Sequence, residues 1–267
     1  CLWKVRIWDE NDRVTEWSPV SSFSIGLLDK SDWTASYIRY NEKSENSVSP
    51  QFRKSFEISE IPEKTFLFVN SLGYHEVYLN GIKAGNNVPA PAVSQFSDRS
   101  QVITYDISAM VKQGRNDIVI WAGKGWYSKG LSGVPFNGPL VRAQIDFLSN
   151  NSWTTHVKTD STWKGRNSGY YDTGTWFPGQ FGGELLDASL LLPDLNEQTL
   201  DSVVWNNIEV VNVSDHLATP QLTEGNIITD TIKPAAIKSL GEKSWFIDMG
   251  TTLTGWTKIR LDRKSVV

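Results

Sequence analysis

Residues 74–84 read YHEVYLNGIKA, and they carry the strongest fold signal in the chain. A β-prone run at residues 74–79 leads into Asn80-Gly81, and a second short run follows at residues 82–84. Asn-Gly between two such runs is typical of a two-residue hairpin turn, because both turn positions need positive φ. The stretch therefore predicts an antiparallel strand pair joined at Asn80-Gly81.

Further β-prone runs surround this hairpin. They lie at residues 52–58, 65–69, 101–105, 117–122, 140–147 and 153–158. Turn-forming residues at 114–116, 132–133 and 149–151 separate several of these runs. Only residues 107–111 indicate a helical turn, and no internal repeat is visible, which disfavours solenoids and propellers. From residue 33 to about residue 187 the sequence thus predicts an all-β antiparallel sandwich or jelly roll.

Both ends of the chain contain strand signals, but too few for a domain. Residues 2–8 (LWKVRIW) alternate with period two, and residues 20–25 read as a second strand. Near the other end, residues 245–249 and 256–261 are predicted to form a last strand pair. Two strands cannot bury a hydrophobic face alone, so each pair is expected to belong to a partial domain. The polar residues 194–234 are expected to include linking chain.

The composition excludes several classes of protein. The chain has 267 residues, with 26 basic and 30 acidic side chains and a net charge of −4. This balance argues against binding to nucleic acid or to a membrane surface through bulk charge. No apolar run reaches the ~20 residues of a membrane span. Cys1 is the single cysteine, so neither an internal disulfide nor a Cys-rich metal site is expected.

No catalytic or metal-binding motif is visible. His75, His156 and His216 have no neighbours at metal-ligand spacing, so a zinc site is not expected. The nucleophile elbow, the dinucleotide fingerprint and the phosphate-binding loop are all missing from the sequence. The 12 tryptophans favour strand packing, but aromatic residues that gather in a turn-rich loop also favour sugar binding. Trp126 and Tyr127 lie in such a loop, and the alternative there is a packed loop corner.

Several stretches, taken in order, resemble the N-terminal half of bacterial α-L-rhamnosidases of glycoside hydrolase family 78. They are WKVRIWDENDRVTEWSPVSSFSIGLLDKSDWTASYI (residues 3–38), SPQFRKSFEI (49–58), NSLGYHEVYLNGIKAGNNVPAPAVSQFSDR (70–99), TYDIS (104–108), GRNDIVIWAGKGWY (114–127), GGELLDAS (182–189) and FIDMGTTLTGWTKIRL (246–261). No single stretch is decisive, but together they cover nearly the whole chain in the family's order.

The resemblance implies a three-part organisation. Residues 1–28 would be the end of a fibronectin-type III-like module. Residues 29–220 would be a galactose-binding-like jelly-roll or β-sandwich domain, and residues 221–267 the start of a further β-sandwich. The family's catalytic (α/α)6 barrel would lie beyond residue 267, so no catalytic residue and no activity are expected in this chain alone. Glu184 and Asp187 are expected to be structural, and Ser189 stands where the family usually has an arginine that could form an ion pair.

The resemblance also implies a sugar and calcium site. In some members the middle domain binds rhamnose through a calcium ion, on loops that correspond here to residues 85–87 and 133–139. Asn86, Asn87, Asn137 and Pro139 are the implied calcium ligands, since calcium accepts amide and backbone carbonyl oxygens. The family pattern has an acidic residue near position 86, where this chain has the neutral Asn86. The alternative is that Asn86 and Asn87 are turn residues only.

Three functions remain open at this point. The first is the non-catalytic N-terminal portion of a rhamnosidase that removes terminal α-L-rhamnose, with the remaining domains of the parent enzyme as partners. The second is a stand-alone carbohydrate-binding module that grips rhamnose, with calcium as a candidate cofactor and Asn86, Asn87, Trp126, Tyr127 and Asn137 as contacts. The third is a structural or interaction β-sandwich without sugar recognition. The family favours a periplasmic or secreted bacterial setting.

Overall fold

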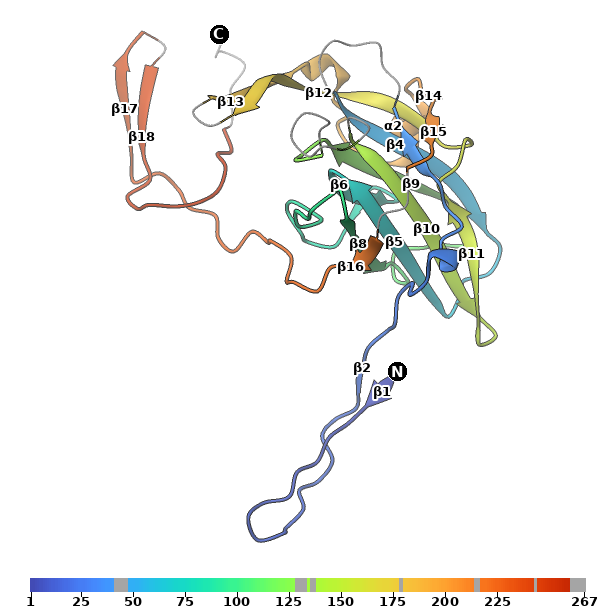
Figure 1. Cartoon of the computed structure of the whole chain (residues 1–267). Coiled ribbons are helices and arrows are strands. Elements are labelled where there is room, and N and C mark those ends of the chain that lie inside the picture. Colours follow the sequence, from blue (N-terminus) through green and yellow to red (C-terminus); the bar gives the residue numbers. More distant parts are fainter. Residues whose placement is uncertain are drawn as a thin grey trace. The chain divides into compact units, whose positions relative to one another are not determined.

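The computed structural model describes residues 1–40, 48–127, 134, 138–177, 180–213, 217–242 and 244–259 (Figure 1). The chain divides into two compact units, residues 1–227 and residues 228–267. The first unit contains two seven-stranded sheets and one short hairpin, and the second contains another short hairpin. Of the helices in the described ranges, none is long and apolar enough to cross a membrane.

One sheet, called the β5 sheet here, has the strand order β15-β3-β10-β5-β8-β16, and β11 also pairs with β10. Its strands are β3 (Tyr37–Arg39), β5 (Lys64–Leu72), β8 (Arg99–Asp106), β10 (Leu140–Ser149), β11 (Ser152–Lys158), β15 (Glu209–Val211) and β16 (Leu217–Pro220). The pairings in this sheet are antiparallel except that β16 runs parallel to β8.

The other sheet, called the β9 sheet, has the order β13-β12-β4-β9-β6-β7, and β14 also pairs with β12. Its strands are β4 (Val48–Ile58), β6 (Tyr74–Leu79), β7 (Ile82–Ala84), β9 (Gly114–Gly123), β12 (Lys164–Phe177), β13 (Gln180–Leu186) and β14 (Asn206–Asn207). The predicted hairpin is confirmed: Leu79 pairs with Ile82, and Asn80 and Gly81 have φ of 53° and 82°.

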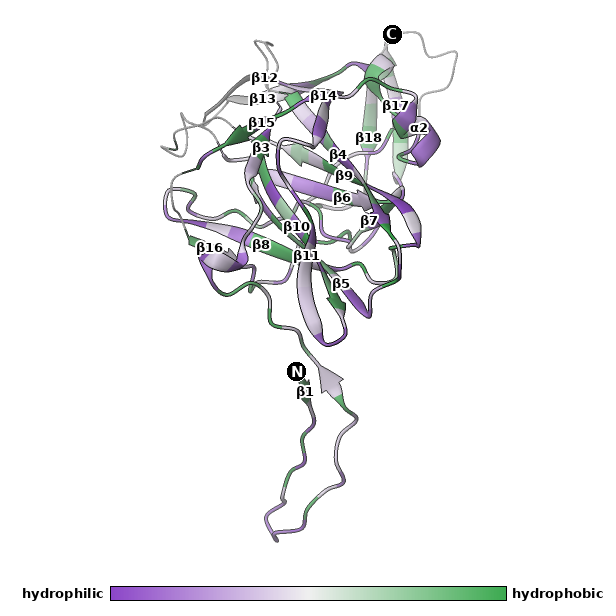
Figure 2. Cartoon of the chain, turned by 90° about the vertical axis from the view of Figure 1, so that its right-hand side faces the viewer, coloured by the Kyte–Doolittle hydropathy of each residue, from purple (hydrophilic) through white to green (hydrophobic). Residues whose placement is uncertain are grey.

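The core lies between the two sheets. Phe52 and Ile120 of the β9 sheet join Val69 and Val141 of the β5 sheet in one buried cluster. Successive residues of a strand point to opposite faces, so alternate positions supply this core (Figure 2). The predicted all-β sandwich is therefore confirmed.

Helices are short in the described part of the chain: η1 (Lys30–Asp32), η2 (Ala188–Leu190) and α2 (Glu197–Asp201). The Asn196 side chain caps α2 by accepting a hydrogen bond from the Thr199 amide. Leu200 of α2 is fully buried and packs with Leu195 and Val119 on the outer face of the β9 sheet. Thus part of the polar stretch 194–234, expected to be linking chain, covers one end of this outer face.

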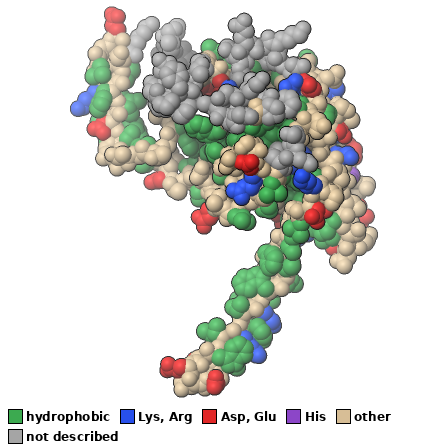
Figure 3. Space-filling model, in the orientation of Figure 1, with side chains coloured by type: hydrophobic (Ala, Val, Ile, Leu, Met, Phe, Trp, Pro, Cys, Tyr) green, Lys and Arg blue, Asp and Glu red, His purple; other side chains and the backbone are tan. Residues whose placement is uncertain are grey.

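Two hairpins flank the sandwich in the sequence. β1 (Leu2–Trp3) pairs with β2 (Ser21–Ser22), and hydrophobic side chains are exposed along this hairpin (Figure 3). In the second unit, β17 (Ala236–Gly241) pairs with β18 (Ser244–Asp248). The sequence predicted residues 256–261 as the partner of the last strand. That pairing is wrong: β18 uses the preceding segment, and residues 256–259 form no strand.

Candidate functional site

The loop after β7 contains two of the residues predicted to bind calcium and sugar. Gly85 begins it with φ of +72°, and a Cβ there would lie 2.9 Å from the Tyr105 ring, so glycine suits both the conformation and the space. Asn86 is exposed, whereas Asn87 is half-buried and forms a backbone bridge with Ile227. The two neighbouring asparagines therefore have different surroundings.

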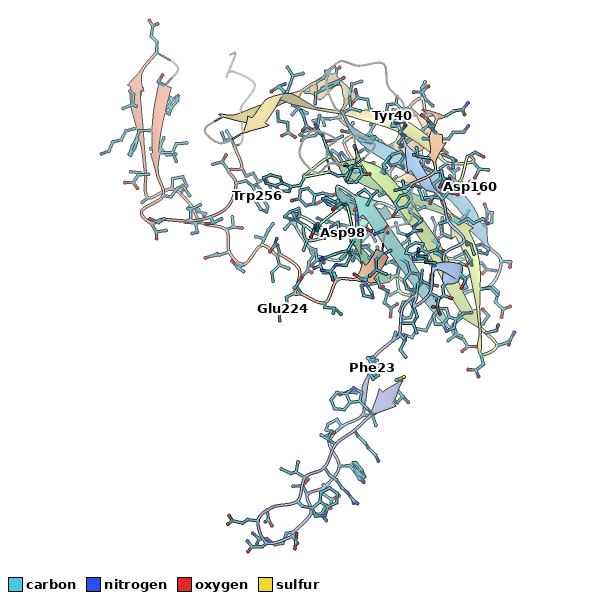
Figure 4. The ribbon with its side chains drawn as sticks, in the orientation of Figure 1. Phe23, Tyr40, Asp98, Asp160, Glu224 and Trp256 are labelled. Atoms are coloured by element: carbon cyan, nitrogen blue, oxygen red, sulfur yellow. The ribbon has the colours of Figure 1, made fainter. Side chains whose placement is uncertain are left out.

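A return segment, residues 217–227, holds this loop in place. The Val88 amide donates to the Asn226 carbonyl at 2.7 Å, and the Ala92 amide donates to Gln221 Oε1 at 2.7 Å. Gly225 lies against the Asn87 side chain, and a Cβ on Gly225 would be 2.2 Å from Asn87 Oδ1. Figure 4 labels Glu224 on this segment, and Asp98 in the loop before β8. The Asn87 amide therefore faces another part of the chain.

Trp126 and Tyr127 are adjacent in sequence but differ in exposure. Trp126 is 41 % exposed, and its side chain hydrogen-bonds with Tyr74. Tyr127 is 1 % exposed and packs edge-to-face against Phe96, with ring centroids 5.4 Å apart. Burial, helped by the nearby Tyr37, raises the pKa of the Tyr127 phenol to about 12. Only Trp126 of the pair offers a ring to solvent.

The other predicted loop contributes less to the described site. Asn137 lies outside the described residues. Pro139 is buried and follows the half-buried Gly138, whose amide donates to the Tyr127 carbonyl at 3.4 Å. Proline can offer a cation its carbonyl oxygen only.

The described donors meet only part of what calcium requires. Asn86, Asn87 and Pro139 supply neutral oxygens, and the described residues include no group of three or more His, Cys, Asp or Glu side chains arranged to hold a metal. Calcium takes about 6–8 oxygen ligands and binds more tightly as carboxylates are added. These donors could therefore complete a shell supplied largely by water and a sugar diol, but they would hold the ion weakly.

A buried polar chain that sequence analysis did not identify lies beneath this loop. Nδ1 of His75 is 2.7 Å from Ser71 Oγ, and Nε2 is 2.9 Å from the Tyr105 hydroxyl. The Ser71 hydroxyl can in turn donate to the Gly73 carbonyl at 3.3 Å. Desolvation lowers the pKa of His75 to about 3, so the ring is neutral near pH 7. The three side chains join the two sheets.

An ion cluster, equally unforeseen, anchors α2. Asp117 accepts hydrogen bonds from Arg53 Nε at 2.9 Å and from Arg115 Nε at 3.0 Å. Arg53 also donates to Asp201 Oδ1 at 2.6 Å and to the Leu200 carbonyl at 2.7 Å. Hydrogen bonds from Arg115 and Arg53 lower the pKa of Asp201 to about 2. The cluster ties α2 to β4 and β9.

Glu184 and Asp187, which the sequence analysis expected to be structural, lie in different surroundings. Asp187 caps η2, and its Oδ1 accepts the Ser189 amide at 3.0 Å and the Ser189 hydroxyl at 2.6 Å. These bonds lower the pKa of the Asp187 carboxyl. Glu184 is exposed on β13, opposite Asp172 of β12. Ser189 thus satisfies the carboxylate in a chain that has no arginine at this position.

Comparison with known proteins gives two family matches. Residues 60–230 match the family described as α-L-rhamnosidase N-terminal domain. Residues 1–29 match the family described as Rha78A-like, N-terminal immunoglobulin domain.

Curated relatives are much longer than this chain. An α-L-rhamnosidase from Formosa agariphila is 27 % identical over 227 residues, which is 80 % of this chain and 24 % of the relative. Another, from Alteromonas sp., is 26 % identical over 281 residues, covering 98 % of this chain and 30 % of the relative. The chain thus spans between 24 % and 30 % of these relatives.

Solved structures show the same fold. An α-L-rhamnosidase from Aspergillus terreus aligns over 96 % of this chain and 30 % of its own, with 24 % identity and a TM-score of 0.81. A Streptomyces avermitilis α-L-rhamnosidase, solved in complex with L-rhamnose, aligns over 77 % of this chain and 20 % of its own, with 17 % identity and a TM-score of 0.64.

Proposed function

Since the chain belongs to the α-L-rhamnosidase N-terminal domain family, we propose that it is the non-catalytic N-terminal portion of an α-L-rhamnosidase. The parent enzyme would hydrolyse terminal α-L-rhamnose from glycans or glycosides, and this portion would support the hydrolase domain. The observation that carries the proposal is the match over residues 60–230, together with curated relatives of which this chain spans less than a third.

Three described carboxylates are held in ways that do not suit glycoside hydrolysis, whereas burial raises the pKa of Asp146 and of Asp172. Glycoside hydrolysis generally needs two carboxyl groups that flank the scissile bond, one of them with a raised pKa as the acid. Asp117 and Asp201 are instead tied to arginines, and Asp187 is tied to Ser189. The pKa values of Asp187 and Asp201 are lowered, which is the wrong direction for a general acid.

Activity measurement tests this proposal. An aryl α-L-rhamnoside is offered to this chain alone and to the longer polypeptide that contains it. We expect release of the aryl group by the longer polypeptide and none above background by the chain alone. Turnover by the purified chain alone would overturn the non-catalytic assignment. If the longer polypeptide cleaves other glycosides but not rhamnosides, the proposed rhamnoside substrate is wrong.

A second candidate function is carbohydrate binding at the loop of residues 85–88, with calcium as a bridging ion. The exposed Asn86 beside a firmly held Asn87 supports it, because the backbone of this loop is fixed before any ligand arrives. Asn86, Asn87 and Pro139 would offer oxygens, and the sugar would complete the calcium shell.

Calorimetric titration of L-rhamnose, first with calcium and then with chelator, tests this candidate. Heat that disappears with chelator and in Asn86→Ala would support a calcium-bridged site. Asn150→Ala, in the turn between β10 and β11, is a control that should retain binding. No heat at millimolar sugar in either condition would remove this site and favour a structural β-sandwich without sugar recognition at the loop.

A further inference from the structure

The outer face of the β9 sheet carries aromatic and charged side chains next to one another. In β6, Val77 faces the core, so its neighbours in the alternation, including Glu76, point outward. The register places Glu76 opposite Trp121 of β9 and Tyr78 opposite Lys83 of β7. We call the following set the outer-face stripe: Tyr74, Glu76, Lys83, Trp121, Trp126 and Tyr170.

The rings of the stripe form two contacting pairs. The Trp121 and Tyr170 rings have centroids 5.6 Å apart and planes inclined by 59°, although they belong to β9 and β12. Tyr74 hydrogen-bonds with Trp126, and its ring lies over Gly125, where a Cβ would come within 2.7 Å. The stripe therefore contains two ring pairs, one between β9 and β12 and the other between β6 and the loop after β9.

Only one end of this outer face is covered by α2 and its flanking residues. Leu195, Leu200 and Trp205 pack over Val119 and Tyr78, next to the stripe. Within the described ranges, the stripe itself stays partly open. Trp121 and Tyr170 are half-buried and Trp126 is exposed. A ligand could therefore reach the rings without displacing α2.

A charged pair at the edge of the rings is fixed in place. The Tyr78 hydroxyl donates to Glu76 Oε2 at 2.7 Å, and the Lys83 ammonium pairs with Oε1. Even so, the Glu76 side chain is 35 % exposed, so each carboxylate oxygen can accept a further hydrogen bond from outside. The two charges cancel, which favours an uncharged ligand rich in hydroxyl groups over an anionic one.

We propose that the outer-face stripe binds a sugar ring, with the apolar face of the pyranose on Trp121 and Tyr170 and its hydroxyls on Glu76 and Lys83. The site needs no metal and is separate from the loop of residues 85–88. Aromatic ring faces flanked by a few fixed polar groups are how proteins orient small amphipathic ligands. That the ligand is a sugar rests on the proposed function. That it binds at this surface rests only on the contacts within the stripe.

Titration in chelator separates this site from the loop. L-rhamnose and methyl α-L-rhamnoside are titrated into the chain without calcium, and binding is followed by calorimetry and tryptophan fluorescence. We expect saturable binding that is about tenfold weaker in Glu76→Gln and in Trp121→Leu. Trp153→Leu is the control for losing a tryptophan elsewhere on the sandwich, because the exposed Trp153 stacks on Phe66 in the β5 sheet. Thermal melting checks that each variant is folded.

Each outcome decides the proposal. Binding that survives chelator and Trp153→Leu but weakens in both stripe variants supports it. Binding that requires calcium, or that weakens equally in Trp153→Leu, overturns it. The chain could also bind no sugar while the longer polypeptide still hydrolyses rhamnosides. That result would overturn sugar binding at the stripe and leave the proposed function intact. If the stripe variants instead destabilise only the longer polypeptide, the stripe is a surface that docks another domain, and the sugar proposal is wrong.

Discussion

At the scale of single residues, His75 makes a clear prediction about stability. Its neutral ring satisfies Ser71 and Tyr105, and burial lowers its pKa to about 3 from an unfolded value of 6.5. The unfolded state therefore binds a proton first as pH falls. The stabilisation is complete above the unfolded pKa and is lost progressively below it. Between about pH 7 and about pH 5 we expect the free energy of unfolding to fall by roughly 2 kcal/mol.

Urea denaturation at several pH values measures this loss. His75→Gln removes the titrating group, so its stability should depend less on pH in this window. His156→Gln is the matched histidine replacement, because His156 is exposed on β11 and takes no part in the buried contacts of His75. If His75→Gln and the unmodified chain show equal slopes, a different group is responsible.

Gly225 makes a second prediction at the same scale. A methyl group there would overlap the Asn87 side chain, so the Asn87 amide or the return segment would have to move. Gly225→Ala should therefore destabilise the first unit by about 1–3 kcal/mol. It should also speed hydrogen exchange at the Val88 amide, which bonds to Asn226. Gly255→Ala is the control, since its Cβ would come no closer than 3.9 Å to another atom.

At the scale of elements, the docking of α2 depends on a buried charge cluster. Asp117 is 3 % exposed and is paired with Arg53, which is also buried. Asp117→Asn leaves two arginines without their shared carboxylate, so we expect a loss of about 3–5 kcal/mol in unfolding free energy. Asp9→Asn, in the exposed pair with Arg13, should cost far less, because solvent screens the pair. Comparable losses in the two variants would show that the cluster does not anchor α2.

Elements with strong local signals could be predicted from the sequence, and β12 could not. The β6–β7 hairpin follows from Asn80-Gly81, whose positive φ is a local property. β12, in contrast, reads KGRNSGYYDTGTWF, which is rich in residues that favour turns. It is a strand because β4 and β13 pair with it on either side, and its register with both is irregular. Such pairing is a tertiary effect without a local signal.

The candidate site shows the same limit. Turn chemistry identifies residues 85–87 as a loop, but the contact of Asn87 with Gly225 joins positions far apart in sequence. Likewise, aromatic content alone did not distinguish the buried Tyr127 from the exposed Trp126. The outer-face stripe draws on β6, β7, β9 and β12, and their order in the sheet decides which side chains meet. The alternation of residues within one strand predicts which face of the sheet a side chain lies on. It does not predict which side chains of other strands lie beside it.

At the scale of the whole molecule, the two units differ in what holds them together. The sandwich has a core drawn from both sheets. In the second unit, none of the described residues is buried, and the hairpin of β17 and β18 exposes Ile237 and Ile247 as a cross-strand pair. A two-stranded hairpin is marginally stable in water by itself. Its stability must therefore come from packing against other structure, as expected for the start of a further β-sandwich.

Hydrogen exchange tests this dependence. In this chain, amides of β17 and β18 should exchange almost as fast as those of an unstructured peptide, whereas amides of β4 and β9 should exchange only on global unfolding. In the longer polypeptide, the same hairpin should become protected, because neighbouring strands would cover Ile237 and Ile247. Protection that is already complete in the isolated chain would mean that residues 228–267 fold without a partner. Equal and fast exchange in both contexts would mean that the hairpin does not belong to a further sandwich.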